Sequence, residues 1–299
     1  SDPADMQPKP CYDQQALMRR YDMVAEICDH MQTLGWGPYQ NDHEDANGQF
    51  EMNWDYNDAL ITADRHSFFK YMVKTVAESN GFRATFMPKP LPNLTGNGCH
   101  AHISVWNNDG LKNLMEDSSG ELGLSELAYH FIGGLLKHAT SIAAVTNPVV
   151  NSYKRINAPR TTSGATWSPN TVTYSGNNRT HMIRIPDIDR VEVRLADGAT
   201  NPYLLQAVLI GTGLWGIDNN TDPGKRLDID MYAEGHKVKN APILPLNLLD
   251  ALRNFKQNKI LRKILGEAFT DSYYKLKMDE WNQYMQHFSE WERINALDV

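Results

Sequence analysis

The chain has 299 residues and a formal net charge of −7, because 29 Lys and Arg face 36 Asp and Glu. This acidic balance argues against a nucleic-acid binder that relies on a basic face. The charged fraction is 22% and the hydrophobic fraction 41%, which is typical of a folded globular protein, and no apolar run reaches the roughly 18 residues that a membrane span needs. Three cysteines without a CxxC motif indicate reduced thiols and therefore a cytoplasmic protein.

In the first third of the chain, helix and hairpin signals alternate. Apolar residues spaced by three and four predict a helix over 14–34, which Gly35 ends. The pair Asn47-Gly48 predicts a two-residue hairpin between strands over 37–46 and 49–56. A second helix is expected over 59–80 and a strand over 82–87, before two prolines.

Strands, loops and long helices follow in the rest of the chain. We expect a strand over 99–106 with a turn at 107–110, a helix over 125–145 capped by Ser125, and loops over 147–169. Strands over 181–186 and 190–195 precede a helix that Asn201-Pro202 opens and that runs to about 218, and the chain is helical from 246. Interspersed strands and helices with hairpins favour an α+β fold over a parallel α/β sheet.

The predicted hairpin contains the first candidate site. A two-residue turn places Glu44 opposite Glu51, with their Cβ atoms roughly 5 Å apart. Two carboxylates at that distance repel each other unless they are neutralised, and a divalent cation with oxygen ligands would do so. The alternative is a solvated hairpin that carries two surface acids.

Two further strands carry polar faces. Strand alternation places His100, His102 and Ser104 on one face, which suits a metal or phosphate site, although a lone His-x-His is more often a half-exposed strand. Arg190, Glu192 and Arg194 likewise share a face, and this arrangement alone indicates an amphipathic strand.

Two arginines just upstream, Arg179 and Arg184, weaken that simpler interpretation. Several guanidinium groups around one carboxylate fit phosphoryl transfer, in which arginines bind phosphoryl and carboxylate oxygens. The sequence contains neither a GxxxxGK[ST] nor a GxGxxG motif, so a P-loop or Rossmann nucleotide site does not apply.

Five segments in series, from about Pro10 to Leu297, resemble the glutamine synthetase family. They are His43-Glu44 with Gly48-Gln49 and Glu51, then 86–90 with 96–104, 147–155, 178–194 and 201–203. The resemblance implies a catalytic domain over 1–299 with a curved antiparallel sheet backed by helices, a fold similar to that of guanido kinases. The family's small N-terminal β-grasp domain and its Glu-x-Glu metal-binding strand precede this region, and we expect both to be absent from this chain.

The resemblance also implies a role for each candidate residue. Two sites for Mg²⁺ or Mn²⁺ would be held by Glu44 with Glu51 and by His100 with Glu192. ATP would contact His102, Ser104 and Arg190, with Tyr56 against the adenine. Glutamate would be bound by Arg155, Arg194 and the Gly96 backbone, while Arg179 and Arg184 would stabilise the transferred phosphoryl group.

The implied activity is that of an ATP-dependent glutamate–amine ligase that proceeds through γ-glutamyl phosphate. Its partners would be glutamate, ATP and a small amine, and the resemblance implies a cytoplasmic dodecamer of two hexameric rings. Thr95 stands where the family usually has an Asn, and the flap over 156–167 lacks the usual Glu. Neutral Thr, Ser and Ala in place of that Glu leave room for a methyl group, which points to the branch that includes γ-glutamylmethylamide synthetases. The expected acceptor is therefore methylamine or ammonia.

Three alternatives remain open at this point. The chain is also compatible with a γ-glutamyl ligase for a larger amine, because the sequence does not show the width of the flap. A guanido kinase-like phosphotransferase would share the arginine cluster, but the carboxylate hairpin and His-x-His favour the ligase. An inactive relative used for binding has no evident physical reason to retain repelling acids and several arginines.

Overall fold

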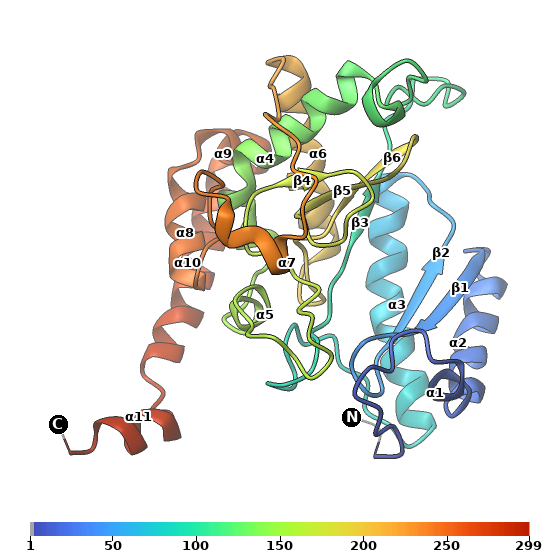
Figure 1. Ribbon diagram of the computed structural model, residues 1–299, viewed down its shortest axis with the longest axis vertical. Coiled ribbons are helices and arrows are strands. Elements are labelled where there is room, and N and C mark those ends of the chain that lie inside the picture. Colours follow the sequence, from blue (N-terminus) through green and yellow to red (C-terminus); the bar gives the residue numbers. More distant parts are fainter. Residues whose placement is uncertain (1–2, 299) are drawn as a thin grey trace.

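The computed structural model describes residues 3–298, in which helices surround two small sheets (Figure 1). At the N-terminal side, helices α2 (Tyr21–Thr33) and α3 (Ala59–Ser79) pack on a hairpin of strands β1 (Pro38–His43) and β2 (Phe50–Trp54). Ile27, Met31 and Trp36 are buried there against side chains of α3. The hairpin therefore has a small hydrophobic core of its own beside the main one.

The helix expected over 14–34 is interrupted. Helix α1 (Gln14–Met18) ends before Arg19, and α2 starts after Arg20, whose φ of −126° is not helical. Arg19 reaches Asp5 at 3.3 Å, and the Arg20 guanidinium lies 4.8 Å from the centre of the Phe82 ring. These contacts outside the helix accompany the break, so the prediction of one continuous helix was wrong.

The register of the hairpin also differs from the prediction. His43 is opposite Phe50 and Asp42 is opposite Glu51, so Glu44 is not the cross-strand neighbour of Glu51. The connection is longer than two residues because Gln49 turns its side chain into the loop. Its Oε1 accepts from the Ala46 N–H at 3.1 Å, and its Nε2 donates to the Gly96 carbonyl at 3.1 Å.

The central sheet has the order β3-β6-β5-β4, with bounds Ala101–Ile103, Arg190–Val193, Ile183–Asp187 and Tyr174–Ser175. The pairs β3–β6 and β5–β6 are antiparallel, but β4 runs parallel to β5. The sheet is therefore mixed and not purely antiparallel as expected. Strand β3 is also shorter than the predicted strand over 99–106.

Residues 82–87, all within the described part of the chain, form no strand, contrary to the prediction. A side chain takes the place of a neighbouring strand there. The Asn97 amide donates to the carbonyls of Thr85 and Met87 at 3.4 and 2.8 Å, and the Asn97 N–H donates to the Pro88 carbonyl at 2.9 Å. This segment is thereby tied to the loop that leads into β3.

Helices α4 (Glu126–Thr146), α6 (Pro202–Asp218) and α8 (Leu248–Gln257) form the main hydrophobic core with the sheet. Ser125 caps α4 and Asn201 caps α6 with Pro202 in its first turn, as predicted. α4 and α6 approach most closely at Gly134 and Gly216, where a Cβ on Gly216 would lie 2.6 Å from the Gly134 Cα.

The remaining helices are short or C-terminal. Helix α5 (Ser152–Ile156) interrupts the expected loop, and α7 (Met231–Glu234) with turns η1 (Glu121–Gly123) and η2 (Gly235–Lys237) lie in connections. Helices α9 (Lys259–Leu265) and α10 (Glu267–Met285) lead to α11 (Glu290–Ala296), which projects from the body (Figure 1). Across residues 3–298, none of the helices has the length and apolarity that a membrane crossing requires.

Candidate active site

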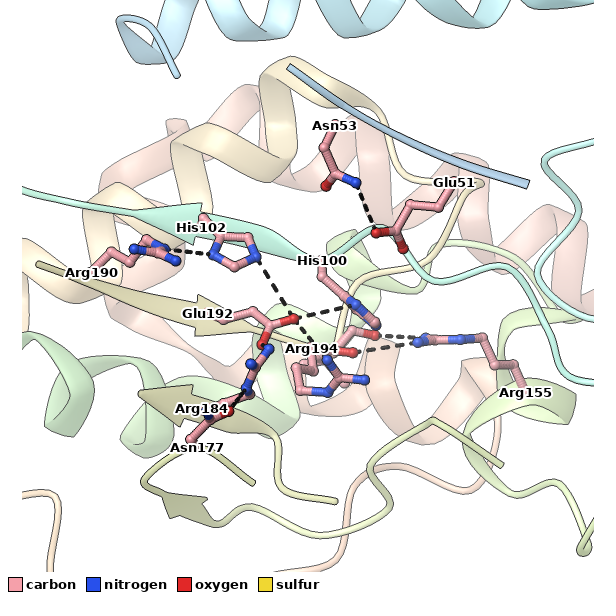
Figure 2. A network of polar contacts seen from close by, with 11 residues as sticks. Glu51, Asn53, His100, His102, Arg155, Asn177, Arg184, Arg190, Glu192 and Arg194 are labelled. Carbon is pink, nitrogen blue, oxygen red and sulfur yellow. Dashed lines mark hydrogen bonds and ion pairs between the residues drawn. The ribbon is translucent and has the colours of Figure 1, made fainter. Parts of the chain in front are cut away.

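Glu192 lies at the centre of a polar network on the central sheet (Figure 2). The strand register places it there: Glu192 on β6 is opposite His102 on β3 and opposite Arg184 on β5. The three side chains therefore form a row across three strands, as strand alternation predicts for residues on one face. The structure brings Arg184, Glu192 and Arg194 together with the two histidines.

Glu192 is paired with two arginines. Arg184 Nη1 lies 2.8 Å from Glu192 Oε2, and Arg194 Nη1 lies 2.7 Å from Oε1. The side chains of Glu192 and Arg194 are each 3% exposed. Burial by itself raises the pKa of the Glu192 carboxyl, but Arg194, His102 and Arg184 outweigh it and hold the pKa below its usual range. Glu192 is therefore an ionised buried carboxylate.

Both histidines approach the same carboxylate from β3 and the residue before it. His100 Nδ1 is 3.4 Å and His102 Nε2 is 3.8 Å from Glu192 Oε1. Burial, followed by the charge of Arg194 and Arg155, holds the pKa of His100 well below its usual value, so the ring is neutral. His100 Nε2 is buried and finds no hydrogen-bond partner among the described residues. A neutral imidazole with a free nitrogen suits a metal ligand.

Arg155 on α5 joins this network at the backbone of Arg194 and Leu195. It is only 2% exposed, and its guanidinium donates to the Leu195 carbonyl at 3.0 Å and to the Arg194 carbonyl at 3.4 Å. The Gly96 backbone passes so close that a Cβ there would lie 2.2 Å from the Pro88 carbonyl and 3.2 Å from Arg155 Cγ. The structure therefore brings Gly96, Arg155 and Arg194 together, three residues to which the resemblance assigns a common role.

The hairpin holds the second acidic group. Burial, followed by the charge of Glu51, raises the pKa of Glu44 to about 7. The two carboxylates are thus electrostatically coupled, although the cross-strand register differs from the prediction. Glu51 accepts a hydrogen bond from Asn53 at 3.1 Å (Figure 2). Within residues 3–298, neither Glu44 nor Glu51 forms an ion pair with an arginine, unlike Glu192.

Tyr12 joins this region and was missed by the sequence analysis. Its φ of +63° is unusual for a tyrosine, and its N–H donates to the His43 carbonyl at 2.8 Å. Burial and then Glu44 raise the pKa of the Tyr12 phenol, whereas Arg179 opposes that rise. The phenol therefore lies within the electrostatic reach of both. A left-handed backbone at a tyrosine has no sequence signal that would have revealed it.

The remaining candidates lie at the edges of the network. Arg190 Nε donates to His102 Nδ1 at 3.3 Å (Figure 2), and Arg190 Nη1 also contacts Asp189 at 2.6 Å. Tyr56 stacks on Trp106 with ring centroids 6.1 Å apart, and the Trp106 indole donates to Ser104 at 2.9 Å.

Arg179 is exposed and forms no ion pair within residues 3–298. Its guanidinium is therefore free to meet a ligand. Arg184, in contrast, is already engaged by Glu192 and by Asn177, to which its Nε donates at 2.9 Å.

Two pairs of side chains have the chemistry of divalent-cation ligands: Glu44 with Glu51, and His100 with Glu192. Each Glu192 oxygen that bonds an arginine retains a second lone pair. Over the part of the chain that is described, no three or more His, Cys, Asp and Glu side chains are grouped to hold a metal ion. Each pair therefore fits part of a metal site, to which other ligands must add.

Comparison with known proteins gives a consistent picture. The family profile described as "Glutamine synthetase, catalytic domain" matches residues 3–295. A "Glutamine synthetase" of Rhizobium leguminosarum bv. phaseoli is 66% identical over 299 residues, which cover 100% of this chain and 69% of that protein. A "Glutamate--methylamine ligase" of Methyloversatilis universalis is 43% identical over 303 residues, covering 100% of this chain and 68% of the relative.

Solved structures agree with this result. A structure titled "GmaS/ADP complex-Conformation 1" is 64% identical in sequence and superimposes with a TM-score of 0.95, covering 100% of this chain and 69% of that one. A second, titled "Apo GmaS without ligand", is 61% identical with a TM-score of 0.93, covering 100% of this chain and 68% of that one.

Proposed function

The chain belongs to the glutamine synthetase family, and from this we propose that it is the catalytic part of an ATP-dependent carbon–nitrogen ligase acting on glutamate. The observation that carries the proposal is the row of His102, Glu192 and Arg184 across the sheet, with His100 and Arg194 on the same carboxylate. A buried carboxylate with histidines on one side and arginines on the other suits a polyphosphate and its counter-cations.

We assign two divalent-cation positions, for Mg²⁺ or Mn²⁺, to the pairs His100–Glu192 and Glu44–Glu51. The free His100 Nε2 and the raised pKa of Glu44 support both assignments. When bound, such cations neutralise phosphate and carboxylate charge. The remaining ligands would come from the Glu-x-Glu strand of an N-terminal segment. The relative from Rhizobium leguminosarum, of which this chain covers 69%, is long enough to contain such a segment.

We assign the binding of glutamate to Arg155, Arg194 and the Gly96 backbone. Arg194 Nε is buried and has no partner within the described residues, so one donor of this guanidinium remains free for a substrate carboxylate. His102, Ser104 and Arg190 would orient ATP, with the Tyr56–Trp106 ring pair at the adenine end. The related structure solved with ADP supports a nucleotide site on this fold.

In the proposed reaction, Arg179 and Arg184 flank the γ-phosphate as it moves. A γ-carboxylate oxygen of glutamate bonds to the γ-phosphorus of ATP while the bond to ADP breaks, which yields γ-glutamyl phosphate and ADP. The amine then attacks the acyl carbon with its lone pair and loses a proton, and phosphate leaves. The arginines lower the barrier by stabilising charge on the transferred group.

For the acceptor we propose methylamine or ammonia, with methylamine as a true substrate. The flap over 156–167 carries no Asp or Glu, so no carboxylate on it selects the small ammonium ion. A relative named glutamine synthetase and a relative named glutamate–methylamine ligase each match the whole chain, so the names alone favour neither amine.

The test is release of ADP by the full-length enzyme with ATP, Mg²⁺ and glutamate, and with no amine, ammonium or methylamine in parallel. Amine-dependent ADP release that disappears in Arg179→Ala supports the ligase. A higher kcat/KM for methylamine indicates that the absence of a carboxylate from the flap determines the choice of amine. Methylamine kinetics no better than the amine-free background would refute the proposal for that acceptor.

We also propose a homo-oligomer, a dodecamer of two hexameric rings. Phe288, Trp291, Ile294 and Leu297 lie on the projecting C-terminal arm and are between 71% and 81% exposed (Figure 1). An apolar surface of this kind is expected to be covered by another subunit. Light scattering of the full-length enzyme and of Trp291→Ser tests this, because loss of the apolar contact should reduce the mass.

A further inference from the structure

Asp45, directly after Glu44 in the hairpin loop, is a buried carboxylate to which the proposed reaction assigns no role. It is 5% exposed. Its Oδ2 accepts a hydrogen bond from the Thr95 hydroxyl at 2.5 Å and another from the Ser163 hydroxyl. One oxygen of Asp45 therefore joins three segments that are distant in sequence: the hairpin, the loop at Gly96 and the flap.

The flap turn is tied down on the same side by further contacts. The Thr162 N–H and hydroxyl both donate to the Asn93 carbonyl, at 2.9 and 3.1 Å. The hydroxyls of Thr161 and Ser163 are 2.9 Å apart, and the Gly164 N–H donates to the Thr161 carbonyl at 2.9 Å. Several hydrogen bonds thus order the turn. Among the described residues, Asp45 is the only carboxylate that contacts it.

The other end of the flap lies near the arginines assigned to glutamate. Burial raises the pKa of the Tyr232 phenol, and Thr166 of the flap, then Arg194 and Arg155, oppose that rise. The Trp167 indole nitrogen is buried and lacks a partner within residues 3–298. The flap therefore contacts Asp45, beside Glu44, through Ser163, and through Thr166 it reaches Tyr232, which lies within the electrostatic range of Arg155 and Arg194.

We propose that Asp45 is a positioning residue that holds the flap over the glutamate and amine site through Ser163 and Thr95. This inference rests on the function proposed above. The flap over 156–167 has no Asp or Glu of its own. Here the hairpin supplies the carboxylate and the flap supplies the hydroxyl, so closure adds no fixed charge to the flap itself. A hydrogen bond to an ionised acceptor is stronger than one between neutral groups, which suits a latch.

The experiment measures hydrogen exchange of 157–168 together with the steady-state kinetics of the full-length enzyme. Asp45→Ala removes the oxygen that accepts from both hydroxyls, and exchange of the flap amides should rise about tenfold or more, the range expected for a charged hydrogen bond. KM for glutamate should rise by a similar factor, while kcat changes less. Asp45→Asn keeps an acceptor oxygen and should recover part of both effects.

Ser163→Ala tests the same latch without removing the buried acid, so the test survives if Asp45→Ala folds poorly. It should loosen the flap as Asp45→Ala does, and the double variant should add little to Asp45→Ala alone, because both remove one interaction. Asp117→Ala is the matched control, since this exposed Asp accepts from Ser119 in a distant loop at 2.7 Å. It should leave flap exchange and KM unchanged.

Two outcomes would overturn the inference. One is flap exchange in Asp45→Ala and Ser163→Ala equal to that of the wild type. The other is a fully additive double variant, which would show that the two residues act separately. If wild type turns over no amine but its flap still loosens in Asp45→Ala, the proposed function fails and the latch stands, so the two failures are distinguishable.

Discussion

The sheet and the hairpin each place acidic side chains in the candidate site, but in opposite electrostatic states. Glu192 on β6 has Arg184 and Arg194 within 2.8 Å, and its pKa is held below the usual range. Glu44 has a neighbouring acid in Glu51, and burial raises its pKa to about 7. The first acid is neutralised by arginines, whereas the second has a like-charged neighbour and forms no ion pair within residues 3–298.

The difference shows which part of the site is built in advance. The arginines hold Glu192 in place without a ligand, so this part of the site is preorganised. The hairpin keeps two coupled carboxylates that form no ion pair in the described part of the chain, and their mutual repulsion lowers stability. Ligand binding should therefore strengthen the hairpin more than the sheet.

The largest effect is expected from Glu192→Gln. The substitution keeps the shape of the side chain but leaves Arg184 and Arg194 buried without a counter-charge. Breaking a buried pair in this way costs about 3–5 kcal/mol of unfolding free energy, which urea denaturation measures. Glu126→Gln is the control, because Glu126 is 90% exposed and should change stability by less than about 0.5 kcal/mol. Equal stabilities of Glu192→Gln and wild type would show that the arginines do not depend on Glu192.

A smaller effect is expected from pH, through Glu44. Its folded pKa of about 7 exceeds the ordinary value of 4.5, so between these values the folded state binds more protons than the unfolded state. Stability should fall as pH rises through this window, by an amount on the order of 2–3 kcal/mol. Glu44→Gln should lose that part of the pH dependence when unfolding free energies at pH 5.5 and pH 8 are compared.

Mg²⁺ sharpens the same measurement. At pH 8, Mg²⁺ should recover the unfolding free energy that the wild-type protein loses between pH 5.5 and pH 8. Its effect on Glu44→Gln should be smaller, because that variant has lost one of the two hairpin carboxylates. The same loss of stability from pH 5.5 to pH 8 in both proteins would assign the pH dependence to other groups.

The smallest effect on stability is expected from Arg179→Ala. Arg179 is exposed and pairs with none of the described acids, so unfolding free energy should stay within about 0.5 kcal/mol of wild type. Turnover should nevertheless fall by about a hundredfold or more. Arg184→Ala should lose both stability and turnover, because Arg184 also holds Glu192. If Arg179→Ala keeps full activity, its assignment to the phosphoryl group is wrong.

Local signals in the sequence predicted the elements whose ends are set by short-range chemistry. Ser125 and Asn201-Pro202 cap their helices as expected, and alternation placed His102, Glu192 and Arg194 on one face. The helix break at Arg20 could not be read in the same way, because its contacts with Phe82 and of Arg19 with Asp5 come from distant parts of the chain.

The hairpin shows why the rest escaped prediction. Asn47-Gly48 indicated a turn, but the Gln49 side chain binds Gly96, and this contact lengthens the loop and shifts the register. Likewise, residues 82–87 resembled a strand. In the structure, however, the Asn97 side-chain amide donates to the carbonyls of Thr85 and Met87, where a neighbouring strand would otherwise pair. In both cases an amide side chain replaced a backbone partner, and sequence periodicity does not show such a choice.

The row of polar side chains across β3, β6 and β5 also bears on how the chain folds. Val191 and Val193 are fully buried on the other face of β6. A slip of one residue would turn these valines toward the polar side and force Glu192 into the hydrophobic core, because side chains alternate along a strand. Only one alignment of the strands satisfies both faces. The residues that we assign to chemistry thus also specify the strand register, because a misaligned sheet would bury an unpaired carboxylate and be less stable.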